Sequence, residues 1–565
     1  MEISVKWNDL FSLIGKKISK KEISKILSLF KCRVKEDSIT EVKIEVPIDR
    51  LDLFSVEGVS RVIRNYLGRK VIIDIEQENS DVKVYVSHEA MKIRPCVSCT
   101  LIENISLSRD VIKQIQQFQE KVHNTYCRGK RKASIFVHDF DKITPPITFT
   151  CKNPDEIKFT PLGEDKVMNA KQILTDTNVG RLHGHLFFAL ERYPVIVDSK
   201  GNVLSIPMLT CSEETRIDEG TSRIFIEVTG VEEGLVDNII SVTVANMTER
   251  GGKIRTTIVS YPHTELITPI LRRKVIKMDV DKTRKLLNIN LEAKKIVEIL
   301  ERAGYGVKIK DEKGIDVLVP YYRFDVTHVN DVIEDILLIY GFNNVESSML
   351  KSNGVVRENR LTRFIEKIRE YMIGLGYQEI LNYTLIDEKI LHEFLGMDEE
   401  NSIKVLNVIS PKHNTLRTWL LPGILEFLSE NIGKKHPQKV FEIGYVTKFS
   451  EKTDTKSISI LKIASAISDS KASYEKIAIA VYLMLKKSRI PFNFEPTTHS
   501  AFIPGRTARV IIGKGQDRHE IGILGEIHPR ILMKFKILNP IVAFELNLQK
   551  IFKYILKKYG GAAEI

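Results

Sequence analysis

The 565-residue chain is poor in cysteine and has no stretch long enough to cross a membrane. Its six cysteines are scattered, so neither a disulfide framework nor a pair of CxxC motifs at zinc-binding spacing is expected. The longest wholly apolar run, residues 477–485, is too short for the roughly 30 Å of a bilayer, and no basic-then-apolar leader opens the chain. We therefore expect a soluble, cytoplasmic protein with reduced thiols.

The common nucleotide-binding signatures are also missing. No GxxxxGK[ST] loop occurs, and no GxGxxG segment leads from a strand into a helix. The single CxxC pair, Cys96 and Cys99, lies in an alternating run that is more typical of a strand than of a metal site. Nucleotide binding through those folds and zinc binding are therefore disfavoured.

Basic residues are in excess, with a formal net charge of +12. This excess suits a polyanion such as RNA, although many Lys-rich soluble proteins share it. Two dense basic clusters would hold RNA phosphates or simply lie in solvent. They are Arg128, Lys130, Arg131 and Lys132, and Lys16, Lys17, Lys20 and Lys21. At one domain per ~100–200 residues, the length predicts roughly three to five domains.

The clearest positive feature is an internal duplication, since residues 18–68 align with residues 291–341 without a gap. The first copy contains VPIDRLDLFSVEGV from Val46, and the second contains VPYYRFDVTHVNDV from Val319. Apolar residues at helical spacing and a short strand precede each segment, so each copy predicts a helix, a strand and a helix. We expect Asp52 and Asp325 to cap the second helix of their copies.

Three carboxylates distinguish the second copy from the first. Asp331, Glu334 and Asp335 align with Gly58, Arg61 and Val62. On a helix the three positions share one face, which Asp325, just ahead of the helix, could join. Such a face suits a hard cation such as Mg²⁺, and the alternative is a solvated acidic face near a helix N-terminus.

The rest of the chain shows two further patterns. Short alternating segments in residues 86–265 predict a strand-rich domain with some helix. Residues 360–565 alternate helical runs with strand candidates, which predicts an α+β domain. His183 and His185 are expected on one face of a strand, without the acid or Cys partner that a metal site needs. The segment His138-Asp139-Phe140-Asp141 is either an acid–base dyad or the start of a polar turn at the end of a strand.

Seven stretches, spread in order through nearly the whole chain, resemble the archaeal/eukaryotic β subunit of phenylalanine–tRNA ligase. They are RPCVSC, KVHNTYCRGKRKASIFVHDFDKITPPITF, VPYYRFDVTHVNDVIEDILLIYGFNN, LRTWLLPGIL, KVFEIGYV, FIPGRTARVIIG and GILGEIHP. The resemblance does not depend on any single stretch. It depends on the order of all seven, together with the duplicated module on both sides of a strand-rich domain.

The resemblance implies a multidomain α/β and α+β protein, with two winged-helix-like helix–strand–helix modules on either side of an editing domain. The implied domains are an N-terminal module in residues 1–85, a B3/B4-like editing domain in 86–265, a B5-like module with Mg²⁺ in 270–345, and a catalytically inactive class II synthetase-like domain with an antiparallel sheet in 355–565.

The resemblance also implies an (αβ)₂ complex in which the α subunit binds ATP and phenylalanine. This chain would support charging of tRNA(Phe), bind that tRNA, and need neither DNA nor a membrane. By the same similarity, a set of four carboxylates looks like the Mg²⁺ ligands that the β subunit shares with the α subunit. The set is Asp325, Asp331, Glu334 and Asp335.

The C-terminal region departs from what class II synthesis requires. That chemistry needs an arginine on a strand, followed two residues later by an acid, and another arginine in a glycine-rich segment, to grip the phosphates of ATP. Residues 440–443 lack the first arginine, and Arg530 is expected in a turn after Pro529, where it is poorly placed. A class II fold reused as an interface is therefore implied.

Editing has its own chemical rationale, because a pocket built for one side chain rejects an analogue that adds a hydroxyl only about 10²-fold. Hydrolysis of mischarged Tyr-tRNA(Phe) would need a polar partner for the phenol and donors around the ester. Ser212, Glu227 and Thr229 are the candidates, and Glu227 and Thr229 face one side of their strand. The alternative is that all three are ordinary residues of the sheet.

Two other functions remain open at this point. A free-standing aminoacyl-tRNA deacylase would explain the strand-rich domain but not the large C-terminal region. A non-catalytic nucleic-acid-binding scaffold would explain the basic charge and the duplication.

Overall fold

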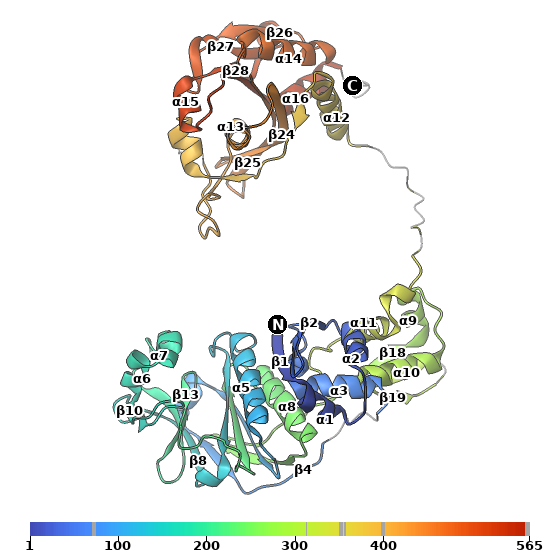
Figure 1. Cartoon of the computed structure of the whole chain (residues 1–565), viewed down its shortest axis with the longest axis vertical. Coiled ribbons are helices and arrows are strands. Elements are labelled where there is room, and N and C mark those ends of the chain that lie inside the picture. The colour runs from blue at the N-terminus through green and yellow to red at the C-terminus, as the bar shows by residue number, and fades with distance from the viewer. Residues whose placement is uncertain are drawn as a thin grey trace. The chain divides into compact units, whose positions relative to one another are not determined.

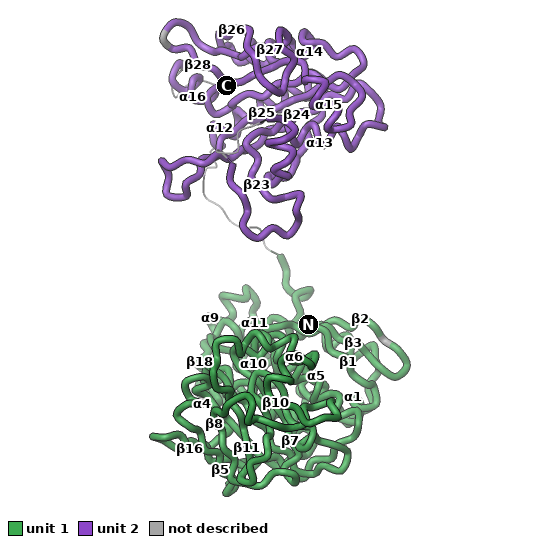
Figure 2. The backbone as a smooth tube through the Cα atoms, turned by 90° about the vertical axis from the view of Figure 1, so that its left-hand side faces the viewer, with its two compact units in different colours: residues 1–349 green, residues 350–565 purple. Residues whose placement is uncertain are grey.

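The computed structural model describes residues 1–69, 75–311, 313–347, 349, 354, 358–396 and 402–559. The chain divides into two compact units, residues 1–349 and residues 350–565 (Figures 1 and 2). No helix in these described ranges has the length and apolar character that a membrane crossing requires.

The two copies of the duplication fold alike. The first consists of β1 (Glu2–Lys6), α1 (Trp7–Ile14), α2 (Lys20–Leu29), β2 (Arg33–Asp37), β3 (Glu41–Glu45), η1 (Leu51–Leu53) and α3 (Val56–Tyr66). The second consists of β18 (Lys274–Asp279), α9 (Val280–Leu287), α10 (Ala293–Ala303), β19 (Gly306–Ile309), β20 (Gly314–Val319) and α11 (Val329–Tyr340), followed by η4 (Phe342–Asn344). The sheet orders β1-β3-β2 and β18-β20-β19 correspond, so the repeat also includes the strand and helix ahead of the predicted core.

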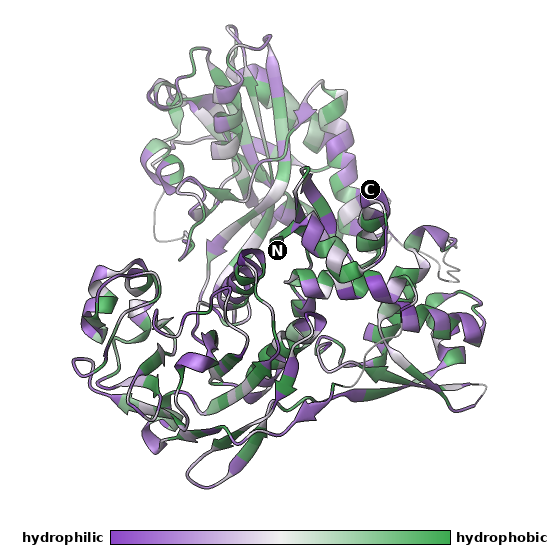
Figure 3. Ribbon diagram, turned by 60° about the horizontal axis from the view of Figure 1, so that its bottom comes forward, coloured by the Kyte–Doolittle hydropathy of each residue, from purple (hydrophilic) through white to green (hydrophobic). Residues whose placement is uncertain are grey.

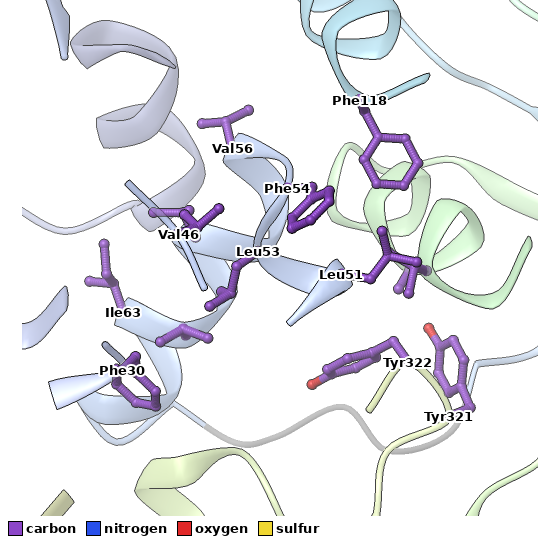
Figure 4. Packing of buried hydrophobic residues seen from close by; sticks show 14 of the residues in the cluster. Phe30, Val46, Leu51, Leu53, Phe54, Val56, Ile63, Phe118, Tyr321 and Tyr322 are labelled. Carbon is purple, nitrogen blue, oxygen red and sulfur yellow. The ribbon is translucent and has the colours of Figure 1, made fainter. Parts of the chain in front are cut away.

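Each module forms because its helices present one apolar face. Helix α2 buries Ile23, Ile26 and Leu27, and α10 buries the matching positions Ile296 and Ile299. Figure 3 shows hydrophilic and hydrophobic residues alternating along the helices of the chain. Helix α3 of the first module packs its apolar residues against the loop that precedes it. Figure 4 shows this packing for the labelled side chains around Leu53 and Phe54. The predicted helix, strand and helix are confirmed, with a two-stranded hairpin in place of the single strand.

The prediction that Asp52 and Asp325 cap the second helices was wrong. The cap of α3 is Ser55, whose side chain accepts from the N–H of Gly58, and the cap of α11 is His328. Both aspartates instead bind the arginine two residues ahead of them, a pairing that spacing alone does not distinguish from a cap.

The described part of the central region contains two large sheets, in strand orders β13-β12-β11-β8-β5-β16-β17 and β4-β15-β6-β14-β7, and the two-stranded sheet β10-β9. Its strands are β4 (Gln77–Glu78), β5 (Lys83–Val86), β6 (Cys96–Glu103), β7 (Ala133–Asp139), β8 (Ile147–Lys152), β9 (Lys158–Phe159), β10 (Met168–Asn169), β11 (Tyr193–Val197), β12 (Val203–Ile206), β13 (Thr210–Cys211), β14 (Ile224–Gly230), β15 (Lys253–Arg255), β16 (Thr257–Ser260) and β17 (Glu265–Thr268). Its helices are α4 (His88–Ile93), α5 (Arg109–Asn124), η2 (Phe140–Lys142), α6 (Ala170–Asp176), α7 (Asn178–His183), η3 (Gly184–Leu186) and α8 (Glu233–Glu249). The predicted strand-rich region with some helix is confirmed.

The second sheet has two differently covered faces. One face packs against α5 and α8, which lie between the central strands and helices α1 and α3 (Figure 1). The other face meets the first sheet across an apolar layer that includes Phe149, Leu204 and Phe225. The placement of His183 and His185 on a strand was wrong, because these residues fall in α7 and η3.

The second unit is built on one mainly antiparallel sheet, in the order β21-β24-β25-β29-β28-β27-β26. Its strands are β21 (Gln378–Glu379), β24 (Gln438–Phe449), β25 (Ser457–Ser468), β26 (Phe492–Pro496), β27 (Phe502–Ile512), β28 (His519–Ile527) and β29 (Ile541–Asn547). Strands β22 (Leu385–Ile386) and β23 (Thr415–Leu416) pair in a separate two-stranded sheet of the same unit. Its helices are α12 (Arg360–Gly374), η5 (Ile390–Phe394), α13 (Leu421–Glu430), α14 (Tyr474–Lys487), η7 (Gly515–Asp517), α15 (Pro529–Lys534) and α16 (Leu548–Tyr559). Helices α12, α14 and α16 cover one face, and α13 and α15 cover the other, as the predicted α+β architecture requires.

The fold of the first module depends on a close approach at Gly58. A Cβ at this position would lie 1.5 Å from the carbonyl oxygen of Asp52. We expect Gly58→Ala to lower the free energy of unfolding by about 1–3 kcal/mol, because the loop must move away from α3. Urea denaturation followed by circular dichroism measures the loss.

Gly234→Ala is the matched control, since a Cβ there meets no atom within 4 Å and the residue lies in the first turn of α8. Its stability should be unchanged or slightly raised. Equal stability of the two variants would contradict the importance of the contact at Gly58.

Candidate functional site

An acidic surface lies on α11, where Asp331, Glu334 and Asp335 occupy positions i, i+3 and i+4 of the helix. Asp325 lies in the loop that leads into this helix. The predicted helical placement of the three carboxylates is confirmed. The four side chains nevertheless have different partners, and these partners decide what each carboxylate is able to bind.

Arg323 holds two of the four carboxylates. Its Nε and Nη2 donate to the two oxygens of Asp325 at 3.0 and 2.8 Å, and Nη2 also donates to Asp335 Oδ2 at 2.8 Å. The hydroxyl of Tyr305 donates to the same oxygen of Asp335 at 2.5 Å. The Arg323 side chain is 4% exposed, so this is a buried, fully bonded ion cluster.

The charge of Asp335 is stabilised by this cluster. Burial would raise the pKa of Asp335, but the charges of Arg323 and Arg50 and the hydrogen bond from Tyr305 hold the pKa below the usual value of an aspartate. Arg50 belongs to the first module and makes the same bidentate bond to Asp52, at 2.8 Å for each oxygen. The two modules therefore share one electrostatic cluster.

The other two carboxylates of α11 lie nearer to solvent. Asp331 Oδ2 accepts from the N–H groups of Thr327 and His328, both at 2.7 Å, and so closes the N-terminus of the helix in a capping box. The side chain of Glu334 is 53% exposed and pairs with Lys31 of the first module at 2.5 Å. A screened surface pair of this kind is worth little and is easily exchanged.

Within the described part of the chain, no group of three or more His, Cys, Asp or Glu side chains could hold one metal ion. The carboxylates of α11 are instead divided among an arginine, two backbone N–H groups and a lysine. Their assignment as Mg²⁺ ligands stays a prediction.

A second set of polar groups lies between the two sheets of the central region, on the face of β14 that carries Glu227. The carboxylate of Glu227 is 1% exposed and accepts a short hydrogen bond from Ser205 on β12 of the other sheet. His138 on β7 is fully buried, and its Nε2 lies 3.7 Å from Glu227 Oε2. This distance is too long for a hydrogen bond.

The remaining partners of His138 lead to the predicted Ser212. The Nδ1 of His138 lies 2.8 Å from Thr215 Oγ1, and that hydroxyl donates to the carbonyl oxygen of Ser212 at 3.4 Å. His138 Nε2 and Glu227 Oε2 have no hydrogen-bond partner in the described residues. A buried imidazole nitrogen and a buried carboxylate oxygen thus face each other with unused bonding capacity, which is costly unless function requires it.

The structure does not join the three editing candidates in one hydrogen-bonded network. Glu227 faces His138 without a hydrogen bond, and Ser212 is reached from His138 and Thr215 only through its backbone carbonyl. The hydroxyl of Thr229 pairs with Ser134 at 3.2 Å. The predicted common face of Glu227 and Thr229 is confirmed, and both are buried.

Sequence reasoning missed Ser205 and Thr215 and gave His138 no role. The available signal was a polar residue inside an otherwise apolar strand, as in VLSI for Ser205 and SIFVH for His138.

The basic run that contains Arg128 is not uniformly at the surface. Lys130 is buried, and its Nζ donates to the carbonyl oxygen of Leu209 at 2.8 Å. Burial lowers the pKa of Lys130 to about 8. Lys130 is therefore withdrawn from the candidate RNA-binding cluster, whereas Arg128, Arg131 and the lysines at positions 16, 17 and 21 are exposed.

Charged groups on the sheet of the second unit bind one another. Glu442 accepts from Arg417 at 2.5 Å and from Asn382 at 2.7 Å. Glu545 pairs with Lys462 at 2.6 Å and also accepts the N–H groups of residues 420 and 421 at the start of α13, at 2.9 and 3.0 Å. These carboxylates are thus committed to internal partners.

The expected place of Arg530 was wrong. This residue lies in the first turn of helix α15 rather than in a free turn, because Pro529 starts the helix and His528 caps it.

Three family models match the chain. The B3/4 domain matches residues 110–249, the tRNA synthetase B5 domain matches residues 276–342, and the phenylalanyl tRNA synthetase beta chain CLM domain matches residues 345–548. Both candidate sites fall inside matched regions, the acidic surface in the B5 match and the Glu227 network in the B3/4 match.

Curated proteins match over almost the full length. The "Phenylalanine--tRNA ligase beta subunit" of Pyrococcus furiosus is 36% identical over 553 residues, which are 97% of this chain and 99% of that protein. The protein of the same name from Pyrococcus abyssi is 35% identical over 560 residues, 98% of this chain and 100% of its own length. A crystal structure of an N-terminal fragment of the phenylalanyl-tRNA synthetase beta-subunit from Pyrococcus horikoshii superposes with a TM-score of 0.58 at 36% identity, over 60% of this chain and 100% of the fragment.

The pairing of Asp335 with Arg323 predicts a pH-dependent stability difference. We expect Asp335→Asn to destabilise the first unit by about 3–5 kcal/mol at pH 7, because the variant leaves a buried guanidinium without one of its anions. Because the folded pKa of Asp335 is lowered, its contribution is fully present above ~3.9, the pKa of an unfolded aspartate, and is lost as the pH falls through the folded value. Urea midpoints of the two proteins at pH 7, 5, 4 and 3 should therefore converge only below about pH 4.

Glu334→Gln serves as the control, since its ion pair is exposed and should contribute at most about 1 kcal/mol. A constant difference between Asp335→Asn and the wild type down to pH 3 would show that the charge of Asp335 is not what stabilises the unit.

Proposed function

The chain belongs to the family of phenylalanine–tRNA ligase β subunits, and on that premise we propose that it supports ATP-dependent attachment of L-phenylalanine to tRNA(Phe) in a cytoplasmic (αβ)₂ complex with a catalytic α subunit. The observation that carries the proposal is the overlap of 97% of this chain with 99% of the Pyrococcus furiosus relative. A free-standing deacylase would not need the C-terminal region, residues 345–548, that matches the CLM domain.

The second unit acts in assembly rather than in synthesis. Triphosphate binding requires cationic side chains that are open to the ligand. Arg417, beside the sheet, and Lys462 on β25 are instead neutralised by Glu442 and Glu545 at 2.5 and 2.6 Å. ATP is accordingly a substrate of the α subunit in this proposal.

The acidic surface of α11 contributes to a Mg²⁺ site that is completed by the α subunit. Carboxylate oxygens are the ligands that Mg²⁺ prefers, and this ion commonly keeps waters and accepts ligands from a partner. Glu334 is exposed, and the hydrogen bonds of Asp331 involve only Oδ2, so these two side chains are the accessible donors. Asp325 and Asp335 both bind the buried Arg323, and these bonds hold helix α11 in position.

The central region hydrolyses mischarged Tyr-tRNA(Phe). The supporting observation is the pair formed by His138 Nε2 and Glu227 Oε2, which lie 3.7 Å apart without other partners among the described residues. Such a pair is able to orient a water and take its proton, or to bind the phenol hydroxyl that distinguishes tyrosine. Because both groups are buried, the two sheets must separate locally at Ser205 to admit a substrate.

The assembly proposal predicts that tRNA(Phe) is charged with phenylalanine only when this chain and an α subunit are mixed. Purified chain and a candidate α subunit should each fail to charge tRNA(Phe), and the two together should succeed. Asp331→Ala/Glu334→Ala should raise the Mg²⁺ concentration that half-maximal phenylalanylation requires, by about ten-fold for loss of two ligands. Aminoacylation with labelled phenylalanine across a Mg²⁺ series measures both effects.

Glu298→Ala/Glu301→Ala is the matched control, because it removes two carboxylates from the neighbouring helix α10, the half-buried Glu298 and the exposed Glu301. An inactive mixture despite a folded complex would favour the deacylase or the nucleic-acid-binding scaffold. If both double variants raise the required Mg²⁺ concentration equally, the carboxylates of α11 are not ligands of the metal.

The editing proposal predicts a separation of functions. Glu227→Gln keeps the size of the side chain and its bond to Ser205 but removes the charge that faces His138. We expect hydrolysis of Tyr-tRNA(Phe) by the complex to fall by about 10²-fold, while phenylalanylation stays within two-fold. Release of labelled tyrosine from preformed Tyr-tRNA(Phe) is the measurement.

Thr243→Val, which removes a buried hydroxyl from α8 on the other side of the sheet, should leave editing intact. Thr229→Val should have a smaller effect than Glu227→Gln, since its hydroxyl bonds Ser134 outside the network. Full hydrolysis by Glu227→Gln would exclude this cluster as the editing centre.

A further inference from the structure

A cavity of about 380 Å³ opens in the first unit where helices α4 and α8 approach the hairpin of β16 and β17. Most of its wall is apolar, with Met91 from α4, Val97 from β6, Val236 from α8 and Leu266 from β17. Its volume lies in the range of cavities that bind small molecules. The cavity is therefore large enough for an organic ligand.

The chain around this cavity is described without a gap. Residues 75–311 are all described, and every lining residue lies between positions 91 and 270. This range begins near β4, which pairs with Ile254 and Arg255, at the opposite end of the β15–β16 segment from the lining residue Tyr261. The charges around the cavity are therefore those of described residues.

Asp237 is a carboxylate on the wall that α8 contributes to the cavity. Its side chain is half-buried, and within the described residues it has no hydrogen-bond donor and no ion pair. Burial raises the pKa of Asp237 above the usual value of an aspartate; the charge of Arg272 lowers it, and that of Glu233 raises it. A half-buried carboxylate without donors costs free energy, so a cation in the cavity would be stabilised beside it.

A second carboxylate of the lining, Glu233, lies one helical turn before Asp237. At a rise of ~1.5 Å per residue, the two positions are about 6 Å apart along the axis of α8. Glu233 pairs with Arg272 at 3.5 Å, and both side chains are 67% exposed. A pair of this kind is screened by solvent and is easily exchanged for another cation. Because Arg272 pairs with Glu233, the charge of Asp237 is left unbalanced.

The thiol of Cys96 lies in the same excess of negative charge. Cys96 begins β6 and lines the cavity, and it is the one cysteine of the six that is not fully buried. Burial raises the pKa of this thiol, and the charges of Glu233, Asp237 and Glu232 raise it further. Glu232 is already paired with Lys132 at 2.7 Å. Asp237 and Glu233 are therefore the carboxylates that a ligand in the cavity would meet.

We propose that this cavity binds an aliphatic polyamine, with one ammonium on Asp237, the methylene chain on the apolar wall and a second ammonium on Glu233. An ammonium group has three donors and no acceptor, so it suits a carboxylate that lacks a donor. A methylene stem packs on apolar surface while its charged end stays with polar groups, as the side chain of lysine does. The proposal does not depend on the function proposed above.

Two further features favour an organic cation over a metal ion. The N–H of Val97 donates to the hydroxyl of Tyr261 at 2.9 Å, which fixes a phenol ring at the cavity. The face of such a ring attracts an ammonium group. Across the described ranges, no group of three or more His, Cys, Asp or Glu side chains could hold a metal ion, and the apolar wall offers no oxygen ligands.

The test measures binding of labelled spermidine to the full chain by equilibrium dialysis at constant ionic strength. We expect saturable binding to the wild type. Asp237→Asn should weaken it by about ten-fold, because the variant removes a charge-assisted bond, and Glu233→Gln should weaken it by about three-fold. Asp237→Asn removes no internal hydrogen bond, so its unfolding midpoint without spermidine should not fall. Glu89→Gln is the matched control, since it removes an exposed carboxylate of α4 that does not line the cavity and should bind as the wild type does.

The thiol of Cys96 supplies a second measurement. Modification of Cys96 with aminoethyl methanethiosulfonate attaches an ammonium group inside the cavity and should abolish spermidine binding. Cys96→Ser, which has no thiol there, should bind spermidine before and after the same treatment. Three outcomes overturn the proposal: absence of saturable binding by the wild type, equal binding by Asp237→Asn and the wild type, or displacement of spermidine by Mg²⁺ as readily as by putrescine at equal ionic strength.

Discussion

The first unit depends on a buried arginine–aspartate ion pair that occurs once in each copy of the duplication. Arg50 binds Asp52 and Arg323 binds Asp325 in the same bidentate geometry, and each pair lies within the electrostatic reach of the other. A buried charge is tolerated only when it is paired and hydrogen-bonded, and Arg50 of the first module also stabilises the charge of Asp335 in the second, so the electrostatics of the two modules are coupled. The acidic helix, the interface with α8 and the continuous apolar core are all arranged around this junction.

The two copies have diverged where their second helices begin. In the first copy the loop descends onto α3, and Gly58 is required because a side chain would meet the carbonyl of Asp52. In the second copy Asp331 occupies the aligned position and turns back to cap its own helix. Arg61 and Glu334 also align, and each reaches a different partner. The same helix position thus carries a buried, ion-paired arginine in one module and an exposed carboxylate in the other.

The polar groups of the two units have opposite characters. On the sheet of the second unit, Glu442 and Glu545 are fully bonded to arginine, lysine and backbone N–H groups, which makes that interior a rigid structural element. Between the two central sheets, His138 and Glu227 face each other with unused bonding capacity. Unpaired buried polar atoms of this kind cost stability, in contrast to the bonded carboxylates of the second unit.

The sequence by itself determined the duplication, the helical and strand faces, the placement of three carboxylates on one helix, and the family. These depend on periodicity and local order, which a linear pattern records directly. Tertiary structure alone decided which partner each charge received. Asp52 and Asp325 bind arginines instead of capping helices, Lys130 is buried, and Ser205 joins Glu227 across two sheets. The contacts of Lys130 and Ser205 link residues on different elements, and the Arg–Asp pairs join neighbours whose side chains packing has buried; no spacing in the sequence encodes either outcome.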